Sequence, residues 1–204
     1  MTNYIYKNDL PNGLDLGKEI AIDTEALGLN NHRDRLCLIQ ISAGNGDAHM
    51  VQFKKGDYEA PNLRKLLENE RVLKIMHFAR FDMAILQQYL GIKIKNVYCT
   101  KIASKIARTY TNSHGLKALI KEFLGFDVSK KEQSSYWGAK EISKSQLKYA
   151  ASDVLYLHQI KEGLEEILER EGRKKVFHEC LKFLNTRVDL DLMGWIEQDI
   201  FAHA

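Results

Sequence analysis

The sequence has few of the residues that mark linkers, disulfide frameworks or membrane spans. Only two of its 204 residues are proline, so no proline-rich linker divides the chain, and the length suits a single domain, 1–204. Its three cysteines, Cys37, Cys99 and Cys180, form no CxxC pair, which argues against a zinc knuckle or a disulfide framework. No apolar run of about 18 residues and no signal-peptide core occur, so we expect a soluble, cytoplasmic protein.

A strong excess of charge of one sign is also missing. Thirty basic residues against 27 acidic ones give a formal net charge of +3. This balance permits a nucleic-acid partner without requiring one. Hydrophobic residues make up 45% and charged residues 28%, which is the composition of an ordinary globular domain.

The first half of the chain predicts an antiparallel meander. Apolar runs with partial alternation favour strands over Glu19–Glu25, Arg35–Ala43 and Asp47–Phe53. Asn45-Gly46, between the last two, is a strong hairpin signal.

The second half alternates between short strands and helices. The predicted strands are Val72–His77 and Val97–Cys99, and the predicted helices are Asn62–Glu68, Phe81–Leu90, Lys101–Thr109, Leu116–Leu124, Ser143 to about Glu169, and Arg173–Asn185. Ser143 and Gln146 form a capping box at the start of the long helix. The fold class is therefore α/β, with a mixed sheet of meander and parallel strands flanked by helices.

Two carboxylates follow the apolar start of the first strand. Asp23 and Glu25 are two residues apart, so their side chains leave the same face of the strand. Adjacent carboxylates repel each other unless one is protonated or a cation neutralises them, and hard oxygen ligands favour Mg²⁺ or Mn²⁺. Taken alone, this pattern is better explained by a turn cap beside a solvated glutamate, because D-x-E is common by chance.

Two further motifs lie on predicted helices. Asp82 ends HFARFD, where a buried strand gives way to a helix, and an acid in a first helical turn is also a plain preference for the helix N-terminus. Tyr149 and Asp153 are four residues apart on the long helix and share a face, as an ordinary surface pair would.

The three motifs together resemble those of the DEDD 3′→5′ exonucleases. D-x-E, a mid-chain aspartate and a late Y-x-x-x-D occur in the same order, and the tyrosine is typical of the DEDDy branch. Within its ribonuclease D-like group, DTEALGLN, HFARFD, QSSYWG and YAASDVLYLH resemble the small bacterial nano-RNase C proteins. Tyr136 stands where those proteins usually have aspartate, which leaves the conformation of that loop open.

The resemblance implies an RNase H-like fold and a two-metal mechanism that releases nucleoside 5′-monophosphates. By motif, Asp23 bridges both ions, Glu25 and Asp153 hold the ion on the nucleophile side, and Asp82 holds the other. Tyr149 orients the attacking water or helps to deprotonate it. The implied substrate is very short RNA such as dinucleotides. The alternatives are ribonuclease D-like processing of longer RNA or DNA 3′ ends, and a non-catalytic nucleic-acid-binding module.

Several residues near these motifs are candidates for substrate binding. They are Leu29, Phe81, His114, Lys131, Gln133, Ser134 and Ser135. By resemblance to related oligoribonucleases, Leu29 is expected to separate two terminal bases, although a core leucine is an equal alternative. Phe81 offers an aromatic face to a base, although a core residue that anchors its helix is an equal alternative. The polar loop, Ser129–Lys140, offers hydroxyl, amide and ammonium groups to phosphate, with Trp137 as its anchor, and a solvated loop with one buried aromatic residue is the equal alternative. Lys101, Lys105 and Arg108 form a basic helical stripe, which is either a solvated face or a nucleic-acid contact.

The end of the chain is rich in large apolar residues. Leu192, Ile196 and Ile200 recur every four residues within Val188–Ile200, and Trp195 adds bulk. We expect this tail, 186–204, to pack either on the chain's own core or against a second copy. The resemblance to nano-RNase C implies a homo-oligomer, an octameric ring.

Overall fold

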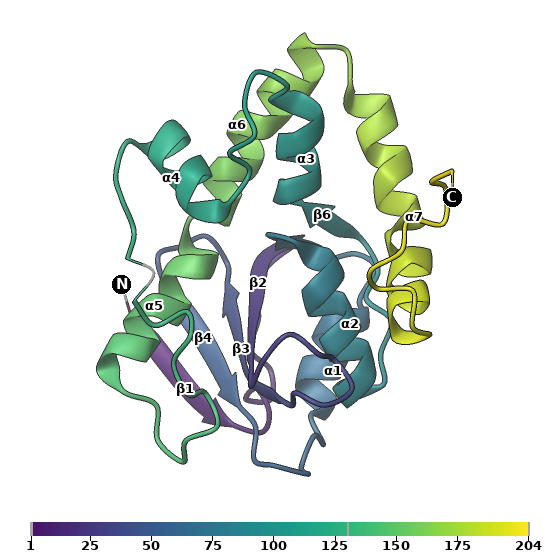
Figure 1. Ribbon diagram of the computed structural model, residues 1–204. Helices are drawn as coiled ribbons and strands as arrows, with labels where there is room; N and C mark the ends of the chain where they lie inside the picture. The colour runs from purple at the N-terminus through teal and green to yellow at the C-terminus, as the bar shows by residue number, and fades with distance from the viewer. Residues whose placement is uncertain (1, 130, 204) are drawn as a thin grey trace.

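A mixed sheet carries the fold in the computed structural model, which describes residues 2–129 and 131–203 (Figure 1). Its strands are β1 (Asn3–Lys7), β2 (Glu19–Ala26), β3 (Leu36–Ser42), β4 (Ala48–Gln52), β5 (Leu73–Met76) and β6 (Val97–Cys99), in the spatial order β1-β4-β3-β2-β5-β6. The β2–β3–β4 meander is antiparallel, and β5 and β6 run parallel to β2, which confirms the predicted sheet. Strand β1, parallel to β4 at the edge, was not predicted.

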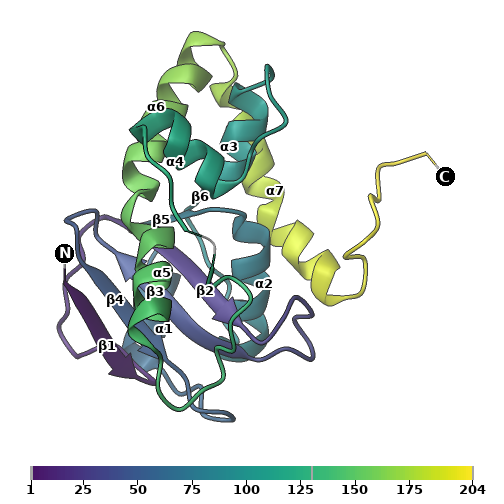
Figure 2. The same ribbon diagram turned by 60° about the vertical axis from the view of Figure 1, so that its left-hand side comes forward.

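The helices lie on both faces of the sheet and beyond one of its ends (Figures 1 and 2). They are α1 (Pro61–Glu68), α2 (Ala79–Leu90), α3 (Thr100–Ala107), α4 (Leu116–Leu124), α5 (Lys144–Leu155), α6 (Leu157–Arg170) and α7 (Lys174–Leu192). Helices α1 and α2 share one apolar core with Ile20 and Ile22 of β2, while α5 and α6 share the other with Ala21. Strand β2 is therefore covered on both faces.

The long helix predicted from Ser143 is two helices. Its capping box is confirmed, because Ser143 and Gln146 bond reciprocally at the start of α5. The prediction was wrong at Tyr156, where a backbone φ of −107° and ψ of −4° separates α5 from α6. Helix α5 packs on β2 and β3, whereas α6 packs on α3 and α4, so the two halves of the predicted helix contact different elements. No helix within residues 2–129 and 131–203 is long and apolar enough to cross a membrane.

Helix α7 runs seven residues beyond the predicted end at Asn185 and packs along α2. Residues 186–192 of the expected tail thus belong to this helix. After Leu192 the chain continues in turns, and Arg187 donates to the backbone carbonyls of Trp195, Ile196 and Gln198. The tail backbone is therefore fastened to α7.

Candidate active site

The carboxyl-terminal half of β2 carries Asp23 and Glu25. Ala21, on the same face of the strand, is fully buried in the core that α5 covers, so both carboxylates emerge at the edge of that core. The register with β3 shifts between Glu25 and Ala26. This irregularity turns the chain away from the sheet into the loop that bears Leu29.

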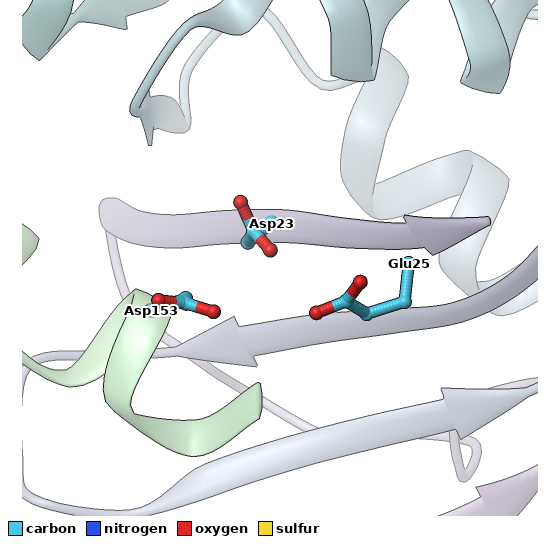
Figure 3. A group of neighbouring side chains, drawn as sticks. All are labelled: Asp23, Glu25 and Asp153. Atoms are coloured by element: carbon cyan, nitrogen blue, oxygen red, sulfur yellow. The ribbon is translucent and has the colours of Figure 1, made fainter. Parts of the chain in front are cut away.

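Helix α5 brings a third carboxylate to this pair. Side-chain oxygens of Asp23, Glu25 and Asp153 all lie within 4.8 Å of one another, and the three groups face a common space (Figure 3). Ala150 and Ala151 are fully buried where α5 crosses the sheet, and their small size allows this close approach. Two segments about 130 residues apart in sequence thus form one acidic cluster.

Asp82 reaches the cluster from the other side of β2. It lies in the first turn of α2, is only 3% exposed, and accepts a 2.7 Å hydrogen bond from the hydroxyl of Thr24. Thr24 alternates with Asp23 and Glu25, so it points toward α2. Asp82 lines the same cleft as the other three carboxylates, although it is not within the 4.8 Å group.

The carboxylates raise one another's pKa. Burial, followed by the charge of Asp82 and then those of Asp153 and Glu25, raises the pKa of Asp23 well above its usual value. Burial and the same neighbouring acids raise the pKa of Glu25 to about 9, and burial raises the pKa of Asp82 to about 7. The cluster therefore favours protons or a cation, and its all-oxygen donors fit a hard divalent ion such as Mg²⁺.

Tyr149 lies one helical turn before Asp153 in the same cleft. Burial, followed by the charge of Asp153, raises the pKa of its phenol, so the hydroxyl stays protonated at neutral pH. The ring of the buried Trp137 lies 6.1 Å from that of Tyr149, centroid to centroid. Trp137 thus packs residues 131–140 of the polar loop against α5, as expected of an anchor.

Most of the candidate residues line one cleft of about 710 Å³. They are Asp23, Glu25, Leu29, Phe81, Asp82, Gln133, Ser134, Ser135, Tyr149 and Asp153. Leu29 is 80% exposed, so it is not a core leucine. Phe81 lines the cleft and also packs against the α1–α2 core. Gln146 holds the polar loop, because its amide donates to the Ser135 hydroxyl (3.0 Å) and the Tyr136 carbonyl.

Three predicted binding residues lie elsewhere. Lys131 is exposed and is not among the residues that line the cleft. His114 also stands outside that lining, with its Nδ1 2.9 Å from the Ser104 hydroxyl. The basic stripe was wrong for Arg108, which is 1% exposed and ion-paired with Glu122 of α4.

Residues of the cleft wall that the sequence did not single out include Thr24, Phe78 and Lys117. Lys101 of the predicted basic stripe also lines the cleft. The ammonium of Lys101 lies 4.2 Å from the ring centroid of Phe78. Thr24 and Phe78 stand inside the motifs DTE and HFARFD, so their position in the sequence was the available signal.

Comparison with known proteins agrees with this geometry. A family model described as 3′-5′ exonuclease matches residues 7–169. Ribonuclease D of Gluconacetobacter diazotrophicus is 31% identical over 154 residues, which are 76% of this chain and 39% of the relative. The chain thus spans about two-fifths of the length of that curated relative.

Solved structures extend the similarity over the full chain. Brucella melitensis NrnC bound to pGG is 54% identical, has a TM-score of 0.96 and is matched over 100% of both chains. The same protein with bound Mg²⁺ gives a TM-score of 0.95 at 54% identity, again over 100% of both chains. Escherichia coli RNase D shares the fold, with 22% identity and a TM-score of 0.73. The match covers 84% of this chain and 45% of the RNase D chain. The chain belongs to the 3′-5′ exonuclease family and is an NrnC-like member of its ribonuclease D-like branch.

Proposed function

We propose that this chain removes nucleoside 5′-monophosphates from the 3′ ends of very short RNA, with two divalent cations, Mg²⁺ or Mn²⁺. The observation that carries this proposal is the acidic cluster Asp23–Glu25–Asp153, whose carboxylates share a cleft with Asp82 and Tyr149. A non-catalytic binding module would gain nothing from clustered negative charge facing phosphates. The 54% identical NrnC structures with pGG and with Mg²⁺ support both the short substrate and the metal.

In this proposal each acid has a distinct place. Asp23, whose charge interacts with those of Asp82, Asp153 and Glu25, would be a ligand of both cations, and Glu25 and Asp153 would hold one of them and Asp82 the other. The bound cations would lower the pKa of the attacking water and stabilise charge on the leaving 3′ oxygen. Tyr149, as a neutral phenol beside Asp153, would orient that water by hydrogen bonding.

The rim of the cleft would hold the two ends of the substrate. Leu29 projects from the loop after β2, where it can insert between two bases. Ser134 and Ser135 line the same cleft on the polar loop, which Gln146 holds through the Ser135 hydroxyl. Their hydroxyls would bind the 5′ phosphate of a dinucleotide, which apart from its scissile phosphate has no other phosphate to contribute affinity.

A length series tests the activity and the substrate class. Purified protein with Mn²⁺ is followed on 5′-labelled RNAs of two to about ten nucleotides and on matched DNA, with Asp153→Asn as the inactive control. We expect release of monophosphates, with the highest kcat/KM on the dinucleotide. A kcat/KM that is highest on the longest RNA would support ribonuclease D-like processing instead, and metal-dependent binding without products would support a binding module.

We further propose a homo-oligomer, an octameric ring, whose walls limit substrate length. Met193, Trp195, Ile196, Ile200 and Phe201 all remain exposed although the tail backbone is fastened to α7. An apolar cluster of this kind at one end of a chain favours burial against a second copy, and closed symmetric assemblies are the usual result. Light scattering at micromolar concentration should give a multiple of the chain mass. A monomer that degrades a 20-nucleotide RNA as fast as a dinucleotide would refute the ring.

A further inference from the structure

The end of α7 touches two elements of the cleft, although it lies beyond the residues that match the exonuclease family, 7–169. In the loop that bears Leu29, the Nε2 of His32 lies 3.0 Å from the carbonyl oxygen of Leu192. In the first turn of α2, Arg80 pairs with Asp191. Arg80 is two residues from Asp82, so the Arg80–Asp191 pair connects α7 to the helical turn that carries a proposed metal ligand.

The first turn of α2 is poorly fixed by its own sequence. Its N-cap residue, Phe78, adopts the left-handed region with a φ of 65°, and no side chain caps the helix. A non-glycine residue in this conformation persists only where surrounding contacts hold it. The position of Asp82 therefore depends on tertiary contacts to this turn.

Asp191 supplies a bidentate contact to this turn. Its two carboxylate oxygens accept from the Nε and Nη2 of Arg80, and its side chain is only 3% exposed. Arg187 reaches the same carboxylate at 2.9 Å, and Arg80 also donates to the Ile196 carbonyl at 2.6 Å. Bidentate arginine–carboxylate pairs fix the relative orientation of the two side chains as well as their distance.

We propose that Asp191 is a positioning residue: through Arg80 it fixes the first turn of α2 and so holds Asp82 in register with Asp23, Glu25 and Asp153. The proposal rests on the proposed role of Asp82 as a metal ligand. Thr24 fixes the same carboxylate directly from β2, so the ligand is held from both sides. The fold supplies a matched control, because Asp189 on the same helix pairs with Gln87 and Lys93 at the far end of α2.

The test is a calorimetric Mn²⁺ titration of the metal-free protein, with turnover measured against Mn²⁺ in parallel. Loss of a side chain that hydrogen-bonds a metal ligand directly typically weakens metal affinity 10–100-fold, and since Asp191 acts through Arg80 we expect the lower end of this range. We expect Asp191→Asn to raise the Mn²⁺ midpoint of one site about tenfold or more, with turnover partly restored at high Mn²⁺. Asp189→Asn should stay within about twofold of wild type. A wild-type midpoint in Asp191→Asn, or an equal rise in both variants, overturns the proposal.

Arg80→Lys covers the case in which Asp191→Asn does not fold. It keeps the Asp191–Arg187 pair and removes the bidentate contact, together with the Arg80 hydrogen bond to the Ile196 carbonyl, so a smaller rise in the same midpoint is expected. An unchanged midpoint in Arg80→Lys overturns the proposal. Asp82→Asn separates the two hypotheses: full turnover in that variant refutes the role of Asp82 itself, whereas its loss beside an unchanged Asp191→Asn refutes only the positioning role.

Discussion

Two regions of this molecule use charge in opposite ways. Along the α2–α7 seam each acid meets a base: Asp191 lies between Arg80 and Arg187, and Asp189 lies beside Lys93. At the end of β2, side-chain oxygens of three acids, Asp23, Glu25 and Asp153, lie within 4.8 Å of one another. Hydrogen bonds from Gln87 and Lys93 lower the pKa of Asp189, whereas burial and like charge raise the pKa of Asp23. The charges of the seam are balanced within the chain, whereas the carboxylates of the cluster favour protons or a cation.

Removing one acid from the cluster should have the largest effect on activity. Asp23→Asn and Asp153→Asn each remove a proposed ligand while keeping the shape of the side chain. We expect turnover to fall at least about 1,000-fold, or roughly 4 kcal/mol of transition-state stabilisation. The cooperative unfolding transition should persist, because like-charge repulsion is relieved. Near-normal turnover of either variant with Mg²⁺ or Mn²⁺ would contradict the assignment.

Tyr149→Phe should have the next largest effect. It removes a hydroxyl that acts on water in this account, not on metal, so turnover should fall about 100-fold. The calorimetric Mn²⁺ midpoint should remain that of wild type. A variant that loses Mn²⁺ affinity but keeps its turnover at saturating Mn²⁺ would show that the phenol has a different role.

The metal-free protein should lose stability as pH rises. The folded protein holds protons on Glu25 up to about pH 9, whereas the unfolded chain releases them near pH 4.5. The folded state therefore binds more protons between these values, so the free energy of unfolding falls across that window. With EDTA we expect a lower Tm at pH 8.5 than at pH 6, with Mn²⁺ removing most of the difference. A Tm with EDTA that rises over this range would contradict the raised pKa values.

The smallest effect is expected at the exposed part of the seam. Lys93 and Asp189 form an ion pair whose side chains are 56% and 36% exposed, and solvent screens such pairs. Lys93→Ala should lower the free energy of unfolding by no more than about 1 kcal/mol and leave turnover unchanged. A loss of turnover comparable to that of Tyr149→Phe would mean that the two regions are coupled beyond Arg80.

The carboxylate site could be predicted because each part of it follows a local rule. Strand alternation places Asp23 with Glu25, and helical spacing places Tyr149 with Asp153. The order of the three motifs along the chain, which resembles that of the DEDD exonucleases, then indicated that these pairs belong to one site. The hydrogen bond from Thr24 to Asp82 could not be predicted in this way, because it joins residues 58 positions apart on different elements.

Other features depended on partners that the local pattern does not contain. Strand β1 is short and mostly exposed, and its pairing with β4 is decided by the finished sheet. Arg108 has the spacing of a surface stripe, but its side chain is buried in an ion pair with Glu122 on α4. No glycine or proline marks the break at Tyr156, which is set by the different surfaces that α5 and α6 cover.

The most direct test of the central claim uses two copies of one five-nucleotide RNA, one labelled at the 5′ end and one at the 3′ end, with Mn²⁺ or with EDTA. The account predicts that the 3′ label leaves at once as a mononucleotide, while the 5′ label passes through a ladder shortened by one nucleotide at a time. Both reactions should stop with EDTA and in Asp153→Asn. Immediate release of the 5′ label as a mononucleotide, or an unchanged rate with EDTA, would contradict a metal-dependent 3′→5′ exonuclease.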